Sequence, residues 1–549
     1  MTKIKRVIIM RVADFFCGGG GFSEGFRQAG FEIVFAVDKW EPAVKTYKGN
    51  KPCVKVIQDD VIRLSQLSDD EFDALVPDTE VIIGSPPCQS FSHSNKSGNA
   101  DKSIGIQLVE AYLKIIARKK YKQGSILKYW VLENVPAVKQ YIEEEYTAAD
   151  FGLEGDFVLR PHDGASGKYN AKYFGAPTNR ERYLCGEFPR PIETKGDNDV
   201  TTLKQVLDSL GNPLRADHGL ITDINYPGLS LDAQQITDQH YIYELAEFEC
   251  KTAKRLKQDK GYMGKMSFPE NLDKPARTVM ATMTASAREA MILGYGDGRY
   301  RLPTVREAAC MMSFPIDYWF YGESKGIKHT LVGNAVPPKL SYAVAVAIAN
   351  AEKETIPEKY IPIMHPNDEQ LYFYNLNGVD FKIKKEKPKR ETAKFKYHIP
   401  YLIIDAYRVE LTNYRSDFKN GKYLWEVEIH HSQGKDRANF FTPNITIRVL
   451  PSQFQECVRD YLERIKNLIP NMNTFQSVFC MTTEARSKQT YYGPFELLDD
   501  IKAFIETTFA PEMQKKYIRF GNEPNTVPLA IAVGYLILRR AVSHMRRLK

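Results

Sequence analysis

Cysteine is scarce in this chain, and long hydrophobic runs are missing. Eight cysteines are scattered through 549 residues, at positions 17, 53, 88, 185, 250, 310, 457 and 480, without a Cys-x-x-Cys pair or the His spacing of zinc sites. This pattern argues against a disulfide scaffold and predicts a cytoplasmic protein without a structural metal. The longest apolar run near the C-terminus, 528–538, has about half of the ~20 residues that a membrane-spanning helix requires, so we expect no membrane segment.

A strong charge of one sign is also absent. Lys and Arg number 75 against 68 Asp and Glu, a formal net charge of +7. This mild excess suits a polyanionic partner without demonstrating one. Hydrophobic residues at 43% and charged residues at 26% are typical of folded globular proteins. The length predicts about three structural units.

The N-terminal third of the chain shows an alternation of strand and helix patterns. Apolar strand patterns at 7–16, 32–38, 80–85 and 129–135 are separated by amphipathic stretches such as 41–50 and 107–120. Strand, helix, strand at this spacing predicts a Rossmann-like, parallel, doubly wound α/β sheet. Ligands of such sheets bind at the carboxyl ends of the strands.

Later segments predict further domains. The first domain spans 7–190 and is completed by about 328–352, whereas 191–327 reads as a small, loop-rich domain with turn signals between 211 and 271. Prolines and dense lysines mark 353–397 as a linker or basic arm. An extra α+β domain follows at 398–549, with strands expected at 401–411, 423–431 and 444–450 and helices near 452–468 and 496–508.

A run of four glycines, Gly18–Gly21, lies between the first strand and its helix. Such a turn lets the backbone approach a ligand closely. Asp38 closes the second strand about 20 residues on, where an acid can bind ribose hydroxyls, and Asp60 is placed to accept from an adenine amino group. Each acid could equally be a helix cap. Because Phe22 follows the glycines in place of the Lys and Ser or Thr of a phosphate-binding loop, an adenosine ligand lacking phosphates is favoured.

The most informative segment is Gly84-Ser-Pro-Pro-Cys88, followed by a polar loop with Ser90, Ser92 and Ser94. A lone cysteine is more often a small buried hydrophobe than a nucleophile. Here two prolines restrict the backbone at the end of a strand and give the thiol a defined direction. The pattern therefore indicates a nucleophilic Cys88.

These motifs occur in the order found in the DNA cytosine carbon-5 methyltransferases, which the chain resembles over about residues 7–350. Pro87-Cys88 matches the family's Pro-Cys motif and Glu133-Asn134-Val135 its Glu-Asn-Val motif. Further matches are Arg180-Glu181-Arg182, Arg277-Thr278, 304–309 and 333–338. The resemblance implies transfer of a methyl group from S-adenosylmethionine to carbon 5 of cytosine in a specific duplex DNA sequence, leaving S-adenosylhomocysteine.

The resemblance also assigns roles. Cys88 would add to carbon 6 of the cytosine because carbon 5 is too electron-poor to be methylated directly. Glu133 would protonate or stabilise the ring near N3, and Arg182 and Arg180 would hydrogen-bond O2. The base would leave the duplex to reach the thiol. The implied cofactor contacts are Phe16, Gly18, Gly20, Gly21, Asp38, Asp60, Pro87, Asn334 and Val336, with no metal.

Two departures from the family pattern concern details of the pocket. Thr178 stands where many relatives have Gln, and Lys39 stands where Trp often follows the ribose acid, with Trp40 one place later. The variable segment at about 191–275 is expected to read the target sequence. Its candidate base readers are Arg215, Gln234, Gln235, Arg255 and Lys257.

The region beyond the resemblance is harder to interpret. Eight basic residues between Lys382 and Lys396 predict either phosphate contacts or a solvated linker. Glu426-Val-Glu428 lacks the lysine of the common Glu-x-Lys nuclease core, so we favour an accessory DNA-binding or dimerisation module. The family context suggests restriction-modification or defence, with a cognate endonuclease as a possible partner.

Two rival functions remain. One is a tRNA cytosine methyltransferase of the same fold. The other is a non-catalytic DNA-binding regulator, against which intact Cys88, Glu133 and Arg182 argue.

Overall fold

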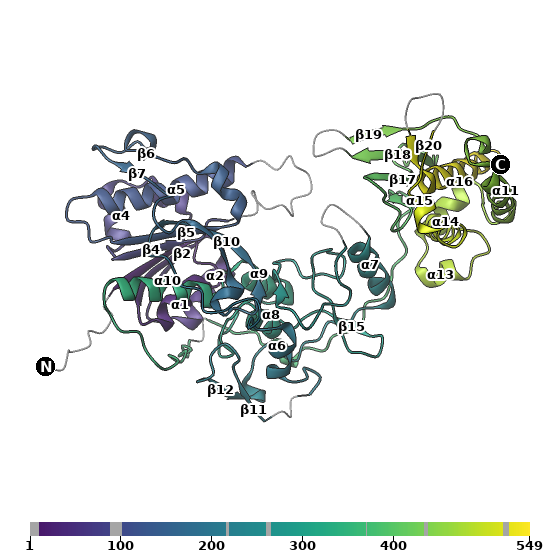
Figure 1. The fold of residues 1–549 in the computed structure, drawn as a ribbon. Coiled ribbons are helices and arrows are strands. Elements are labelled where there is room, and N and C mark those ends of the chain that lie inside the picture. Colours follow the sequence, from purple (N-terminus) through teal and green to yellow (C-terminus); the bar gives the residue numbers. More distant parts are fainter. Residues whose placement is uncertain are drawn as a thin grey trace. The chain divides into compact units, whose positions relative to one another are not determined.

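The computed structural model describes residues 10–87, 102–215, 219–259, 265–368, 371–432, 438–519 and 526–548. The chain forms two compact units (Figure 1). Unit 1 comprises Met1–Leu245 and Pro269–Ile383, and unit 2 comprises Ala246–Phe268 and Lys384–Lys549. Unit 2 therefore includes a segment from the middle of the chain.

A seven-stranded sheet organises unit 1. Its order is β3-β2-β1-β4-β5-β10-β8, with β1 at Arg11–Phe15, β2 at Glu32–Asp38, β3 at Lys55–Gln58, β4 at Val81–Gly84, β5 at Tyr129–Asn134, β8 at Gly167–Asn170 and β10 at Glu181–Glu187. The first five strands are parallel, and β10 pairs antiparallel with both β5 and β8. The predicted doubly wound sheet is confirmed, and the antiparallel β10 adds a reversal that the alternating pattern did not predict.

Helices cover both faces of this sheet (Figure 1). On one face lie α1 (Gly21–Gln28), α2 (Glu41–Asn50) and α10 (Pro338–Ala351), whose apolar residues share a core with β1 and β2. On the other face lie α3 (Val61–Ser65), α4 (Asp69–Leu75) and α5 (Ser103–Tyr121). Because α10 comes from far along the chain, a late segment packs on the same face of the sheet as α1 and α2.

The rest of unit 1 is rich in loops. It holds α6 (Leu203–Leu210), the pair β11 (Leu220–Thr222) and β12 (Ser230–Asp232), α8 (Val305–Met311) and α9 (Lys325–Asn334). Among the described residues one helical stretch, 325–351, is long and apolar enough to cross a membrane, but 67% of its apolar window is buried. It is also interrupted, because α9 ends at Asn334 and α10 begins at Pro338.

Part of the segment predicted as a linker packs along unit 1. The backbone oxygen of Ile361 accepts from Arg27 and Gln28, at 2.9 and 2.8 Å. His365 stacks on Trp319 with ring centroids 3.7 Å apart. Residues 360–368 and 371–381 thus belong to unit 1, which extends to Ile383.

Unit 2 combines an antiparallel sheet with helices. Its strands are β16 (Lys396–His398), β17 (Tyr407–Thr412), β18 (Glu426–Ser432) and β19 (Ala438–Phe441), in that order. The longer helices are α7 (Glu247–Gln258), α11 (Ser452–Lys466), α12 (Met472–Cys480), α14 (Pro494–Thr508) and α16 (Leu529–Met545). The apolar run 528–538 supplies the fully buried side of α16, so it forms the core of unit 2. The extra α+β domain is confirmed.

One strand prediction in unit 2 was wrong. Residues 444–450 contain a 3-10 turn at Ile447–Val449, and the fourth strand is β19. β-branched residues favoured a strand here. Instead the backbone bonds to itself, from Val449 N to Thr446 O and from Leu450 N to Ile447 O. Its start is held by Arg539 of α16, which donates to Asn444 Oδ1 at 3.0 Å.

Candidate active site

The glycine turn between β1 and α1 has a left-handed backbone at several positions. Gly18 and Gly20 have φ of 50° and 79°, and Phe16, a non-glycine residue, has φ of 54°. A Cβ at Gly20 would lie 2.5 Å from the Tyr318 hydroxyl, and one at Gly21 would collide with the carbonyl oxygen of Val336. The turn therefore requires glycine for its conformation and for close packing against the 335–336 backbone.

Asp38 fixes this turn. Its carboxylate accepts from the backbone N–H of Gly18 at 2.9 Å and of Trp40 at 2.8 Å. Burial raises the pKa of Asp38, and these backbone bonds partly offset that rise. Asp60 lies differently: it caps α3 by accepting from Ile62 N at 2.9 Å and pairs with exposed Lys39 at 2.7 Å.

A cavity of about 330 Å³ opens at the carboxyl ends of β1, β4 and β5. It is lined by predicted cofactor contacts (Phe16, Gly18, Gly21, Asp38, Pro87, Asn334 and Val336) and by predicted catalytic residues (Glu133, Arg180 and Arg182). Gly20 and Asp60 are not among the lining residues, and Cys88 lies outside the described residues. The cavity is thus bounded by residues that lie up to about 320 positions apart in the sequence. It lies at the carboxyl ends of the parallel strands, where ligands of doubly wound sheets bind.

Sequence reasoning missed several wall residues of this cavity. Trp40, Ser85 and Leu331 line it as well. Trp40 carried a signal, since an aromatic residue near the ribose acid is a family feature displaced here by one position. Leu331 carried none, because an apolar residue on α9 looks the same whether it faces a core or a pocket.

Glu133 and Arg182 face each other on neighbouring strands. Pairing of β5 with β10 sets Leu184 opposite Glu133, and Arg182, two residues before Leu184, lies on the same face of β10. The Nε of Arg182 lies 3.0 Å from Glu133 Oε1, and the two side chains are 10% and 7% exposed. Burial raises the pKa of Glu133, and Arg182 followed by Arg180 opposes the rise. Glu133 is therefore a buried acid whose proton affinity depends on its arginine partners.

The segment leading to Cys88 is anchored to both neighbouring strands. Asn134 Nδ2 donates to Pro86 O at 2.9 Å, and its Oδ1 accepts from Val135 N at 2.8 Å. Ser85 N donates to Phe15 O at 3.2 Å. Because Asn134 follows Glu133 directly, the acid and the Pro86-Pro87 turn are held by one short piece of β5.

Arg180 has a different role from Arg182. Its guanidinium donates to the backbone oxygens of Val279 at 3.2 Å, Gly333 at 3.0 Å and Ala335 at 3.1 Å. The side chain is 2% exposed. Arg180 thus fixes the 333–335 turn, which carries the cavity wall, and its predicted contact with a base stays a prediction.

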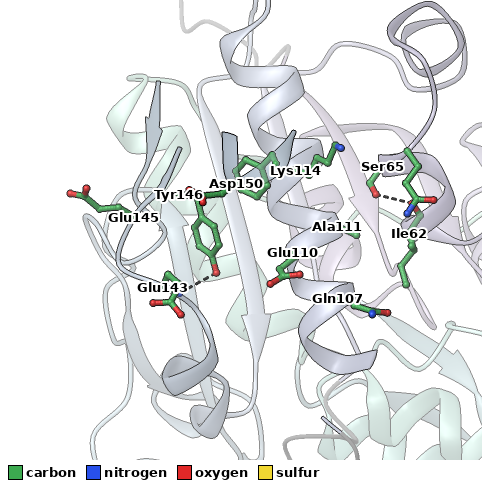
Figure 2. Close-up of a pocket in the computed structure, with 12 residues that line it drawn as sticks. Ile62, Ser65, Gln107, Glu110, Ala111, Lys114, Glu143, Glu145, Tyr146 and Asp150 are labelled. Atoms are coloured by element: carbon green, nitrogen blue, oxygen red, sulfur yellow. Dashed lines mark hydrogen bonds between the residues drawn. The ribbon is translucent and has the colours of Figure 1, made fainter. Parts of the chain in front are cut away.

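A larger hollow, of about 630 Å³, lies elsewhere in unit 1, beside α3 and α5 (Figure 2). Its walls carry four carboxyl groups, at Glu110, Glu143, Glu145 and Asp150, with a single lysine, Lys114. Burial raises the pKa of Glu110. None of the predicted site residues lines this hollow. An acidic wall of this kind disfavours an anionic partner, so size alone does not identify the functional cavity.

The predicted base readers fall into two groups. Arg215, Gln234 and Gln235 are exposed in unit 1. Arg255 and Lys257 lie on α7 in unit 2, where the Arg255 guanidinium is 4.5 Å from the centre of the Tyr397 ring and Lys257 is fully buried. These two side chains pack within unit 2 and are not presented to solvent as groove readers would be.

The cavity fits S-adenosylmethionine in its chemistry. Glycine backbone without Cβ atoms, an acid at the end of the second strand and the aromatic side chains of Phe16, Phe22 and Trp40 suit an adenosyl group that lacks phosphates. Among the described residues no three His, Cys, Asp or Glu side chains gather as a metal site would need. The prediction that the chain binds no metal remains a prediction.

Comparison with known proteins agrees with this geometry. Residues 10–350 match the family of C-5 cytosine-specific DNA methylases. Similar chains include M.MJ0563P of Methanocaldococcus jannaschii (30% identical; 62% of this chain and 99% of that protein), type II methyltransferase M.MthTI of Methanothermobacter thermautotrophicus (27%; 62% and 97%) and type II methyltransferase M.HgiDI of Herpetosiphon aurantiacus (28%; 62% and 94%). Most of unit 2 lies outside the family match, which ends at residue 350.

The family match covers more than half of the chain and contains every residue that lines the 330 Å³ cavity. Members of this family use S-adenosylmethionine and act on DNA. The chain belongs to the C-5 cytosine-specific DNA methylases and is a DNA (cytosine-5-)-methyltransferase.

Proposed function

We propose that Cys88, Glu133 and Arg182 carry out the methylation at a target cytosine in duplex DNA, beside S-adenosylmethionine in the 330 Å³ cavity. One observation carries the proposal: the Glu133–Arg182 pair, the glycine turn and Pro87, the residue before Cys88, all line that cavity. Methyl transfer to a ring carbon requires a cofactor site next to an acid that can interact with the ring, and the cavity brings these two features together.

The chain's own residues would hold the cofactor as follows. Backbone of Gly18 and Gly21 and the ring of Phe16 border the methionine part, and the Asp38 carboxylate accepts from the ribose. Pro87, Asn334 and Val336 close the opposite wall. Gly20 does not line the cavity and would contribute by keeping the turn compact. Asp60 does not line the cavity either and would accept from the adenine amino group. When bound, the cofactor supplies an electrophilic methyl group.

Cys88 would start the reaction on the base. Its thiolate forms a bond to carbon 6 of the cytosine, and the electron pair of the 5,6 double bond makes carbon 5 nucleophilic. After carbon 5 has gained its methyl group, its proton leaves to a base. The electron pair of that C–H bond re-forms the double bond and expels the thiolate. The thiol is therefore regenerated, and no oxidant or metal takes part in this scheme.

Glu133 and Arg182 would manage the charge of the ring. A protonated Glu133 donates to N3 as negative charge builds up there, and its raised pKa keeps more of the acid protonated near neutral pH. Arg182 donates to O2 and holds Glu133 in position. Because the cavity is recessed, the cytosine must rotate out of the duplex to reach these groups.

The cellular setting follows from the relatives. Two of the similar chains are named type II methyltransferases, so this enzyme would protect DNA in a restriction-modification or defence system in the cytoplasm. A cognate endonuclease recognising the same sequence would be its partner. The loop-rich part of unit 1, with Arg215, Gln234 and Gln235, would read that sequence.

The test uses duplex DNA containing 5-fluorocytosine, in which fluorine replaces the proton on carbon 5 and cannot leave in the elimination step. Incubation with labelled S-adenosylmethionine should give a complex that survives denaturation, with the cross-link at Cys88. Cys88→Ala should abolish it, whereas Cys53→Ala, an exposed cysteine away from the cavity, should react like the parent. An adduct that persists in the Cys88 variant would overturn the proposal.

A further inference from the structure

Charge is divided unevenly between the two units. Over the full sequence, unit 2 contains 34 Lys and Arg against 21 Asp and Glu, a formal charge of +13, and unit 1 contains 41 against 47, a charge of −6. The mild +7 of the whole chain therefore conceals a strongly basic unit. A DNA-modifying unit with net negative charge is repelled at long range by phosphates, so the attraction must come from elsewhere in the chain.

The densest positive segment of unit 2 is Lys384–Lys396, here called the basic strip. Its backbone is fixed along α12: Lys389 N donates to Cys480 O at 2.7 Å, and Gln476 Nε2 donates to the carbonyls of Glu391 and Ala393 at 2.8 and 3.1 Å. Its far end is fixed too, because Phe395 N donates to Asn413 Oδ1 at 2.6 Å. A solvated linker would not have its carbonyls and N–H groups paired in this way from residue 389 to residue 395.

The strip contains two acids, Glu386 and Glu391, and the carboxylate of Glu386 is engaged away from the lysines. Glu386 accepts from Thr483, at 2.7 Å from its backbone N–H and 3.1 Å from its hydroxyl. Lys385, Lys387 and Arg390 are exposed, and within the described part of the chain no carboxylate lies within ion-pair distance of them. Three cations are thus open to solvent: Arg390 on the fixed backbone, and Lys385 and Lys387 on either side of Glu386, whose side chain is anchored to Thr483.

Chain connectivity keeps unit 2 close to the substrate. The chain leaves unit 1 after Leu245, returns at Pro269 and leaves again after Ile383, so two separate segments tether unit 2. The first segment includes α7, which is joined to the strip where Lys384 lies 3.7 Å from Glu249. Tethering of this kind gives a second binding surface a high effective concentration on the same DNA.

We propose that the basic strip binds the phosphate backbone of the duplex DNA substrate and supplies much of its affinity, while unit 1 supplies the chemistry. The inference rests on the proposed function for the identity of the substrate. Phosphate contacts of this type carry no sequence information, so the strip would strengthen binding equally on all duplexes.

The test compares three full-length variants by fluorescence anisotropy with a labelled duplex at 50–300 mM KCl. Lys385→Gln/Lys387→Gln/Arg390→Gln should lower the slope of log affinity against log salt by about 0.9 per lost phosphate contact, or roughly 2.7 in all. Affinity near 0.1 M salt should fall about tenfold or more. The charge-preserving variant Lys385→Arg/Lys387→Arg/Arg390→Lys should bind like the parent.

A matched control removes the same charge from unit 1. Lys48, Lys353 and Lys359 are exposed there and lie outside the cavity, so their triple Gln variant should keep the parental slope. An unchanged slope in the strip variant, or an equal fall in this control, overturns the inference. Failure of the proposed function is visible separately, because it would remove the 5-fluorocytosine adduct at low salt in the parent as well.

Discussion

Replacing Arg182 by Met should make the stability of unit 1 depend on pH through Glu133. The two side chains are buried and 3.0 Å apart, so the variant leaves a carboxylate in a dry site without its counter-charge. Burial raises the pKa of Glu133, and Arg182 is the strongest of the groups that lower it. Its removal must therefore raise the pKa of Glu133 further.

The size of the effect follows from the distance. Two unit charges 3.0 Å apart at an effective dielectric constant of about 20 attract by roughly 5.5 kcal/mol, and breaking a buried pair costs about 3–5 kcal/mol. This cost disappears at any pH low enough for Glu133 to be protonated in the folded variant. A carboxyl whose folded pKa is raised stabilises the fold below its unfolded pKa and loses that contribution as pH rises. The deficit should thus be about 1 kcal/mol near pH 5 and grow by up to ~1.4 kcal/mol per pH unit towards pH 8.

Urea unfolding followed by tryptophan fluorescence from pH 5 to 8.5 measures this deficit, since three of the four tryptophans (Trp40, Trp130 and Trp319) lie in unit 1. Adding Glu133→Gln to Arg182→Met should remove the pH dependence. The exposed pair Arg160–Glu145, 2.9 Å apart, provides the control: Arg160→Met should cost less than about 1 kcal/mol at every pH. A flat profile for Arg182→Met would refute the electrostatic coupling.

Two further predictions concern groups around the cavity. Burial raises the pKa of Asp14 to about 7 from 3.8. The free energy of unfolding of the parent should therefore fall by about 4 kcal/mol as pH rises to 7 and above. Thermal unfolding should show that this fall is lost in Asp14→Asn and kept in the control Asp156→Asn, a change at an exposed residue. Arg180→Lys keeps the charge, but the lysine cannot reach three carbonyls. This variant should lower the free energy of unfolding by about 3 kcal/mol and weaken S-adenosylmethionine binding, measured by calorimetry. Arg182→Lys should lower turnover and leave cofactor affinity near the parental value, and equal cofactor affinities in the two variants would contradict the positioning role of Arg180.

Local sequence features were enough to predict β1, β2, β4 and β5 and the amphipathic stretches of α2 and α5. An apolar strand pattern, an amphipathic stretch and the glycines after the first strand each act within a few residues. The reversal at β10 was not predictable in this way, because strand direction depends on which partner a strand finds. The failure at 444–450 has the same origin, since propensity favoured a strand and the contact with Arg539 decided against it.

The residues of the candidate site could be predicted from the sequence where a motif specifies the residue type and its spacing. Asp38 was placed by its spacing from the glycines, and its bond to Gly18 shows why that spacing holds the turn. Glu133 and Arg182 lie 49 positions apart, and only the pairing of β5 with β10 brings them together. Asp60 shows the opposite case: a helix cap and a ribose or adenine acceptor share one pattern, so sequence alone leaves both open.

The division of charge gives the two units different sensitivity to salt. In the proposed function, methyl transfer would take place in the recessed cavity, where the Glu133–Arg182 pair is shielded from ions, so turnover at saturating DNA should hardly respond to salt. The encounter with DNA depends on exposed cations, and these lie mainly in unit 2. Salt should therefore raise KM for DNA and leave kcat almost unchanged.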